Sequence, residues 1–69
     1  MNISVNGENV DTEKSSLTIS ELLIIRKVEK PEMLSVQLNG NFVDKKNYDL
    51  TFVKENDEVD FLYFMGGGF

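Results

Sequence analysis

The stretch Glu58-Val59-Asp60-Phe61-Leu62-Tyr63-Phe64 is the last predicted strand of this sequence, and it runs directly into Met65-Gly66-Gly67-Gly68-Phe69. Successive side chains of a β-strand point to opposite faces of a sheet. The odd-numbered residues of the strand are all apolar, so we expect them to face the core. On the other face, Leu62 and Phe64 are expected to form an apolar patch on the open side of the sheet, beside the glycines.

Two predicted β-hairpins precede this strand. Residues 3–5 alternate between apolar and polar, and Asn6-Gly7 follows them as a strong signal for a tight turn. Residues 35–39 alternate in the same way and lead to Asn39-Gly40, a second turn of this type. The return strands are predicted at about residues 8–13 and from residue 42 onward, and a shorter apolar segment at residues 50–53 leads to a polar turn at residues 54–57.

Between the hairpins lies one predicted helix. Thr18 and Glu21 have the spacing of a capping box, in which each side chain bonds to the other residue's backbone N–H. The helix is predicted to run to about Lys27, with Ile24 exposed and with Arg26 falling on the core face. The apolar residues of that face follow helical spacing and are Ile19, Leu22 and Leu23.

The order of these elements predicts an α+β protein. Strands at both ends of the chain with a helix between them favour a mixed sheet of four to five strands, covered on one face by that main helix. The first and last strands are expected to lie side by side at its centre. This is the β-grasp, or ubiquitin-like, arrangement, with a domain at residues 1–64 and a flexible glycine-rich tail at residues 65–69.

Composition narrows the classes of function. A chain of 69 residues has room for one small domain, and it contains no His and no Cys, which supply the commonest general base, thiol nucleophile and zinc ligands. We therefore expect a protein that is not itself an enzyme and binds no metal or cofactor. A net charge of −5 disfavours nucleic acid as a partner. The sequence shows no signal peptide and no apolar run that would span a membrane, so a cytoplasmic location is expected.

The tail predicts chemistry at a backbone carboxylate. Gly66 and Gly67 carry no side chain that would collide with the walls of a narrow channel, so they suit an approach to another protein's active site. A carboxylate is a poor electrophile until it is joined to AMP, which then leaves when a sulfur nucleophile attacks. Because the chain has no Cys, any sulfur that it carries would sit on the C-terminal carbonyl as a thiocarboxylate. Leu62, Phe64 and Met65, at the base of the tail, are the predicted contacts with the partner.

Five segments, in their order and spacing along the chain, carry a resemblance to a known family. They are Ile3-Ser4-Val5-Asn6-Gly7-Glu8, Thr18-Ile19-Ser20-Glu21-Leu22-Leu23, Leu38-Asn39-Gly40 with Val43, Glu55-Asn56-Asp57-Glu58-Val59, and Gly67-Gly68. Across essentially its whole length the chain resembles the ThiS family of sulfur carrier proteins. The resemblance implies that Gly68 is adenylated by a ThiF-type enzyme using ATP and magnesium, receives sulfur from a persulfide protein, and delivers it to the thiazole synthase ThiG.

Two positions depart from the family pattern. Arg26 replaces an apolar helix residue, and Phe69 follows the diglycine, where the family usually ends. If Phe69 stayed in place, Gly68 would be held in a peptide bond, so we predict that a protease removes Phe69. Two alternatives remain open. One is another sulfur carrier on the same fold, either MoaD-like and serving molybdopterin or a related carrier for cysteine, homocysteine or tRNA thiolation. The other is a β-grasp binding module without chemistry.

Overall fold

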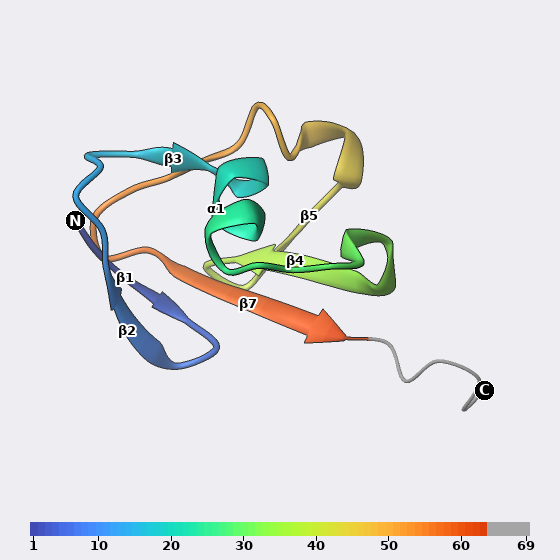
Figure 1. Cartoon of the computed structure of the whole chain (residues 1–69), viewed down its shortest axis with the longest axis horizontal. Coiled ribbons are helices and arrows are strands. Elements are labelled where there is room, and N and C mark those ends of the chain that lie inside the picture. Colours follow the sequence, from blue (N-terminus) through green and yellow to red (C-terminus); the bar gives the residue numbers. More distant parts are fainter. Residues whose placement is uncertain (64–69) are drawn as a thin grey trace.

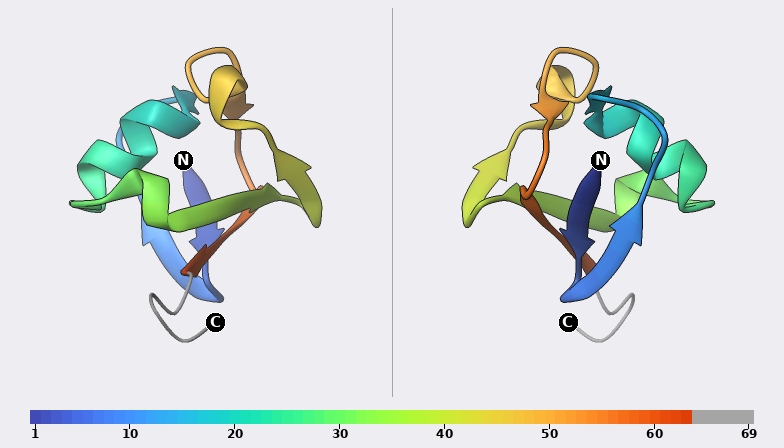
Figure 2. Two further views of the ribbon diagram at one scale, coloured as in Figure 1. Left: turned by 90° about the vertical axis from the view of Figure 1, so that its right-hand side faces the viewer. Right: turned by 90° about the vertical axis from the view of Figure 1, so that its left-hand side faces the viewer.

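The structure is a computed structural model that describes residues 1–63 of the chain. These residues form a five-stranded sheet, one α-helix that covers one of its faces, and a small two-stranded sheet (Figures 1 and 2). The strands are β1 (Asn2–Val5), β2 (Glu8–Asp11), β3 (Leu17–Thr18), β4 (Leu34–Leu38), β5 (Asn41–Val43), β6 (Phe52–Val53) and β7 (Glu58–Tyr63); the helices are α1 (Ile19–Ile25) and two short 3₁₀ turns, η1 (Pro31–Met33) and η2 (Lys45–Asn47).

The predicted β-grasp arrangement is confirmed. The large sheet has the order β2-β1-β7-β4-β5, so the first and last strands of the chain are neighbours at its centre. β7 runs parallel to β1 and antiparallel to β4, with Val59 opposite Val5 on one side and Phe61 opposite Val36 on the other. The strand that leads into the tail is therefore paired with β4 along its length and with β1 over its first two residues.

Both predicted hairpin turns are present. Asn6 and Gly7 have φ angles of 52° and 82°, and Asn39 and Gly40 have angles of 52° and 84°. A positive φ at both central residues is the geometry of a two-residue type I′ turn, which Asn-Gly favours. Asn39 also ties its hairpin to the start of β7, because its Oδ1 accepts from the backbone N–H of Glu58 at 2.8 Å. The return strand β2 ends at Asp11, two residues before the predicted end.

The capping box at the start of α1 is confirmed. The Thr18 hydroxyl accepts from the Glu21 N–H at 3.1 Å, and the Glu21 carboxylate accepts from the Thr18 N–H at 2.8 Å. That backbone hydrogen bond lowers the pKa of Glu21, because it stabilises the charged carboxylate. The helix packs its apolar stripe into a core formed by Ile3, Val5, Leu17, Ile19, Leu22, Leu23, Leu34, Val36, Val43, Tyr48, Val53, Val59 and Phe61.

The helix is shorter than predicted. It ends at Ile25 rather than near Lys27, with Arg26 as the C-cap and Lys27 in the left-handed region at a φ of 57°. A residue with positive φ just after the last turn is a common way for a helix to stop. Arg26, expected on the core face, instead reaches across to β2, where its guanidinium lies 3.0 Å from a carboxylate oxygen of Glu8.

Tyr63 was expected to face the core together with Val59 and Phe61. It lies on their face of the sheet, directly opposite the buried Leu34, but its side chain is 57% exposed and the expected burial is wrong. The reason is the length of the neighbouring strand. β1 ends at Val5, so within residues 1–63 no strand lies beside Tyr63 on that flank.

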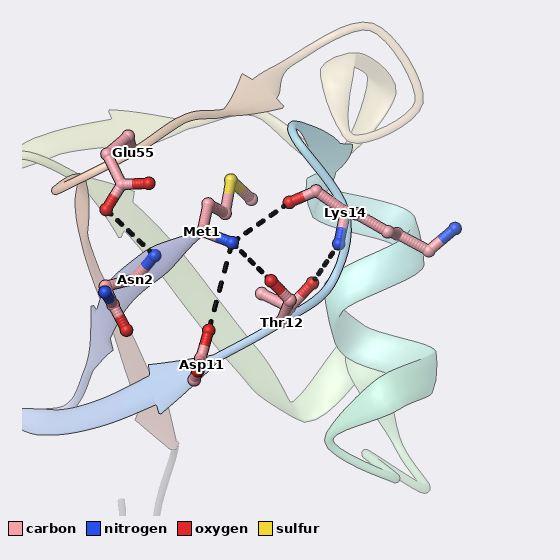
Figure 3. A network of polar contacts seen from close by, with 6 residues as sticks. All are labelled: Met1, Asn2, Asp11, Thr12, Lys14 and Glu55. Carbon is pink, nitrogen blue, oxygen red and sulfur yellow. Dashed lines mark hydrogen bonds and ion pairs between the residues drawn. The ribbon is translucent and has the colours of Figure 1, made fainter.

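The start of β1 is held by a network of polar contacts, shown in Figure 3. The amino group of Met1 donates to the carbonyl oxygen of Thr12 and, at 3.3 Å, to that of Lys14. The backbone N–H of Asn2 donates to a carboxylate oxygen of Glu55 at 3.0 Å, which joins β1 to the turn before β7. These contacts fix the position of β1, and so of its parallel neighbour β7.

Candidate functional site

The candidate site lies at the far end of β7, where the chain leads on to the glycines. Leu62, predicted to contact a partner, is 46% exposed and lies on the face of the sheet opposite α1, since Phe61 beside it points into the core. The remaining predicted site residues are Phe64, Met65, Gly66, Gly67, Gly68 and Phe69, and all of them lie outside the described residues. Their predicted roles therefore stay predictions.

A second exposed apolar residue, Phe42, joins Leu62 on the open face. Phe42 in β5 is 67% exposed. In the register of β4 with its neighbours, Leu62 is opposite Ser35 and Phe42 is opposite Gln37, so the two apolar side chains flank the same short stretch of β4. We call Leu62 and Phe42 the open-face pair. Exposed apolar side chains that lie near one another on a surface are typical of a protein–protein contact.

Phe42 was missed as a candidate, although the sequence holds the signal for it. A two-residue turn at Asn39-Gly40 fixes the register of the hairpin, and that register places residue 42 opposite residue 37. Gln37 lies between Val36 and Leu38 in an alternating strand, so it is expected on the open face. Phe42 must therefore share that face, because directly opposite residues in an antiparallel pair project on the same side of the sheet.

Next to Phe42 is a pocket of about 230 Å³ at the edge of the sheet. It opens where β5 leaves β4 to enter η2, and the hydroxyl of the nearby buried Tyr48 has no hydrogen-bond partner within residues 1–63. Burial raises the pKa of Tyr48, and the negative charge of Asp44 adds to this effect. The residues that line the pocket are Leu34, Ser35, Phe42, Asp44, Lys45 and Tyr48.

Replacing Tyr48 with phenylalanine is expected to make the protein less sensitive to alkali. Because the pKa of the folded state is raised, Tyr48 contributes stability that is fully present below the unfolded pKa of about 10 and is lost as the pH rises through the folded value. Tyr48→Phe should thus flatten the fall of unfolding free energy above about pH 10. At neutral pH it should change stability by less than about 1 kcal/mol, since the lost hydroxyl is unpaired.

Urea unfolding at a series of pH values checks this prediction. Tyr63→Phe is the matched control, because it removes the same group from an exposed position. The prediction is contradicted if the free energy of unfolding falls equally steeply above about pH 10 in Tyr48→Phe and in the unaltered protein.

Within residues 1–63, no group of three or more His, Cys, Asp or Glu side chains is arranged to hold a metal ion. None of the helices in that part of the chain is both long enough and apolar enough to cross a membrane.

Comparison with known proteins gives consistent matches along the chain. The model of the ThiS family matches residues 2–68, so the match includes Gly68 and stops before Phe69. The sulfur carrier protein ThiS of Bacillus subtilis is 27% identical over 66 residues, which cover 96% of this chain and 98% of that protein. A crystal structure of the thiamine biosynthesis protein ThiS from Geobacter metallireducens is 45% identical, covers 99% of this chain and 100% of its own, and superposes with a TM-score of 0.89. A solution structure from the same organism is 44% identical, with a TM-score of 0.80, over 100% of this chain and 90% of its own.

Proposed function

The chain belongs to the ThiS family of sulfur carrier proteins of thiamine biosynthesis, and from this membership we propose that it carries sulfur as a thiocarboxylate on Gly68. In this proposal the protein is a substrate that partner enzymes modify and use. A ThiF-type enzyme activates it with ATP and magnesium, a persulfide protein supplies sulfur, and the thiazole synthase ThiG receives the sulfur. Phe69 is removed before the first step.

The proposed steps follow from the chemistry of a carboxylate. An oxygen of the Gly68 carboxylate attacks the α-phosphorus of ATP, and pyrophosphate leaves. The terminal sulfur of a persulfide then attacks the carbonyl carbon, and AMP leaves. A thiol that reduces the resulting S–S bond releases the thiocarboxylate. In this scheme all catalytic groups belong to the partners, and this chain supplies the Gly68 carboxylate and positions it for them.

The observation that carries the proposal is the place of Gly68 relative to the fold. The family match ends at that residue, and it lies five residues beyond β7, the central strand of the five-stranded sheet, which is paired with β4 as far as Tyr63. Five extended residues reach about 16–18 Å. That length is sufficient to bring a carboxylate from the edge of a folded domain to a nucleotide site within another protein.

Genetic complementation tests the pathway. A gene shortened to end at Gly68, so that no removal of Phe69 is needed, should restore growth without thiamine to a bacterial strain that lacks its own ThiS. A gene truncated after Gly67 should not. The gene that ends at Gly68 should fail to restore molybdopterin synthesis to a strain that lacks the MoaD-type carrier. Rescue of the second strain and not the first would reassign the chain to a carrier of the MoaD type. Rescue of neither would favour a binding module without chemistry.

The open-face pair is expected to contribute to binding of the activating enzyme. Truncation of one of the few residues that dominate an interface, which cluster near its centre, costs about 2 kcal/mol or more, and about 1.4 kcal/mol corresponds to a factor of ten. Leu62→Ala and Phe42→Ala should each therefore weaken binding about tenfold or more, as measured by calorimetry. Leu50→Ala is the control, because Leu50 is 73% exposed but lies in the segment between η2 and β6. If all three variants bind with equal affinity, the open-face pair does not contact the activating enzyme.

A further inference from the structure

The two flanks of β7 differ at the end that leads to the tail. Along β7, the backbone groups of even-numbered residues face β4: the carbonyl of Glu58 accepts from the Asn39 N–H at 2.7 Å. The backbone groups of odd-numbered residues face β1. The carbonyl of Asp57 accepts from the N–H of Ser4, and the carbonyl of Val59 accepts from the N–H of Asn6, each at 2.9 Å. The backbone of Tyr63 must therefore point toward the flank of β1, since the direction alternates along a strand.

On that flank the sheet stops before β7 does. β1 ends at Val5, and the chain turns away at Asn6-Gly7 into β2. The last contact is made by a side chain: Oδ1 of Asn6 accepts from the N–H of Phe61 at 2.7 Å, where the next strand residue would otherwise supply a carbonyl. Figure 1 shows β7 continuing past the tip of the β1–β2 hairpin. Within residues 1–63, no strand lies beside Tyr63 on this side.

We propose that this flank is a docking edge, and that the adenylating enzyme fills it with an extended segment of its own backbone. The docking edge consists of the Phe61 carbonyl and the Tyr63 N–H and carbonyl. An unpaired strand edge is a template for another strand, and strand addition is a common way for proteins to bind each other. This inference rests on the proposed function, and it specifies how the enzyme holds the chain near its reactive end.

Two observations favour this occupant over others. The side chains that border the edge are both exposed and lie on opposite faces of the sheet: Leu62 at 46% and Tyr63 at 57%. An added strand would place its own side chains beside both of them, and such lateral pairs stabilise a sheet. In addition, the edge leads directly toward Gly66, Gly67 and Gly68. Glycine loses the most conformational entropy on ordering, so a partner that already holds the backbone at Tyr63 lessens the entropy still to be lost when the reactive end is positioned.

Hydrogen exchange at single-residue resolution tests the proposal. The form ending at Gly68 is examined alone and in saturated complex with the cognate ThiF-type enzyme, without ATP. In the free protein the Tyr63 amide should exchange rapidly, and in the complex it should slow by about tenfold or more, because exchange then requires the added strand to open. Leu62, whose N–H faces β4, should be slow in both states. Asn9, whose N–H points outward from the edge strand β2, should be fast in both.

A backbone substitution provides a second test. The chain is short enough for chemical synthesis, so the Tyr63 N–H can be replaced by an ester oxygen while every side chain is kept. The ester should weaken binding of the enzyme by about three- to tenfold, the effect of one lost hydrogen bond. The same ester at Asn9 is the matched control and should leave the affinity unchanged.

Several outcomes would overturn the proposal. One is rapid exchange at Tyr63 in a saturated complex, and another is equal affinity of the two esters. Slow exchange at Tyr63 in a concentrated sample of the carrier alone would assign the edge to a second copy of this chain. Adenylation of Gly68 in the same mixture, read by mass after ATP is added, separates the two claims: adenylation without protection of Tyr63 refutes the docking edge and leaves the carrier function standing. If no complex forms, both claims fail.

Discussion

The form of this chain that ends at Gly68 is expected to be adenylated by its cognate ThiF-type enzyme, and the full chain is expected to react at least about 100-fold more slowly. In the full chain the Gly68 carbonyl belongs to an amide and has no free oxygen to attack ATP. The carboxylate of Phe69 is a poor substitute, because it lies one residue further along and carries a benzyl group. A displacement of about 1 Å from the reactive position can already cost about 100-fold.

Intact mass spectrometry after incubation with ATP and magnesium measures the adenylate directly. Calorimetry supplies the control: both forms should bind the enzyme with similar affinity, since they share the open-face pair and the docking edge. If the two forms bind the enzyme equally but differ in their rate of adenylation, the effect of Phe69 is on the chemical step. Comparable adenylation of the full chain would show that removal of Phe69 is unnecessary.

Leu22→Ala is expected to destabilise the fold by about 2–5 kcal/mol, the usual range for a buried leucine. Leu22 is 1% exposed and faces the sheet from the middle of α1, so its loss leaves a cavity at the contact between helix and sheet. Small domains have an unfolding free energy near the low end of about 5–15 kcal/mol. This single change should therefore leave a large fraction of the protein unfolded at moderate temperature.

The matched control lies two residues away in the same helix. Ile24 is 76% exposed on the outer face, so Ile24→Ala should change the free energy of unfolding by less than about 0.5 kcal/mol. Urea titration followed by circular dichroism measures both variants. If the two substitutions had similar effects, α1 would not be packed on the sheet as described.

The parts of the fold that were predicted correctly depend on local signals. The capping box at Thr18 and Glu21 lies within one turn of helix, and the turns at Asn6-Gly7 and Asn39-Gly40 require a positive φ that Asn and Gly adopt readily. The central pairing of the first and last strands is not local. It followed from the order of elements, because few arrangements bury one helix against a sheet with strands at both chain ends.

The parts that were missed depend on distant contacts. The strands β3 and β6 have two residues each and pair with one another across 34 residues or more of chain, as in Leu17 with Val53. Segments so short show no periodicity. Tyr63 was placed in the core because its strand alternates correctly, but its burial depends on how far the neighbouring strand β1 extends, and β1 ends at Val5. No pattern within the last strand shows the length of its neighbour.

The candidate site divides in the same way. Leu62 was found from the alternation of its own strand, and Phe42 was missed because it joins the site only through the register of another hairpin. The docking edge at Tyr63 needed the hydrogen bonds themselves. It exists because β1 turns away at Asn6 while β7 continues, which is a difference in strand lengths across a parallel pair.

The most direct test of the central claim is the intact mass of the protein isolated from the organism that encodes it, grown without thiamine. The account predicts a chain that ends at Gly68, with a fraction in which one carboxylate oxygen is replaced by sulfur. That fraction should lose its extra mass when the thiocarboxylate is hydrolysed to the carboxylate. A chain that retains Phe69 and carries no sulfur, in cells that are making their own thiazole, would contradict it.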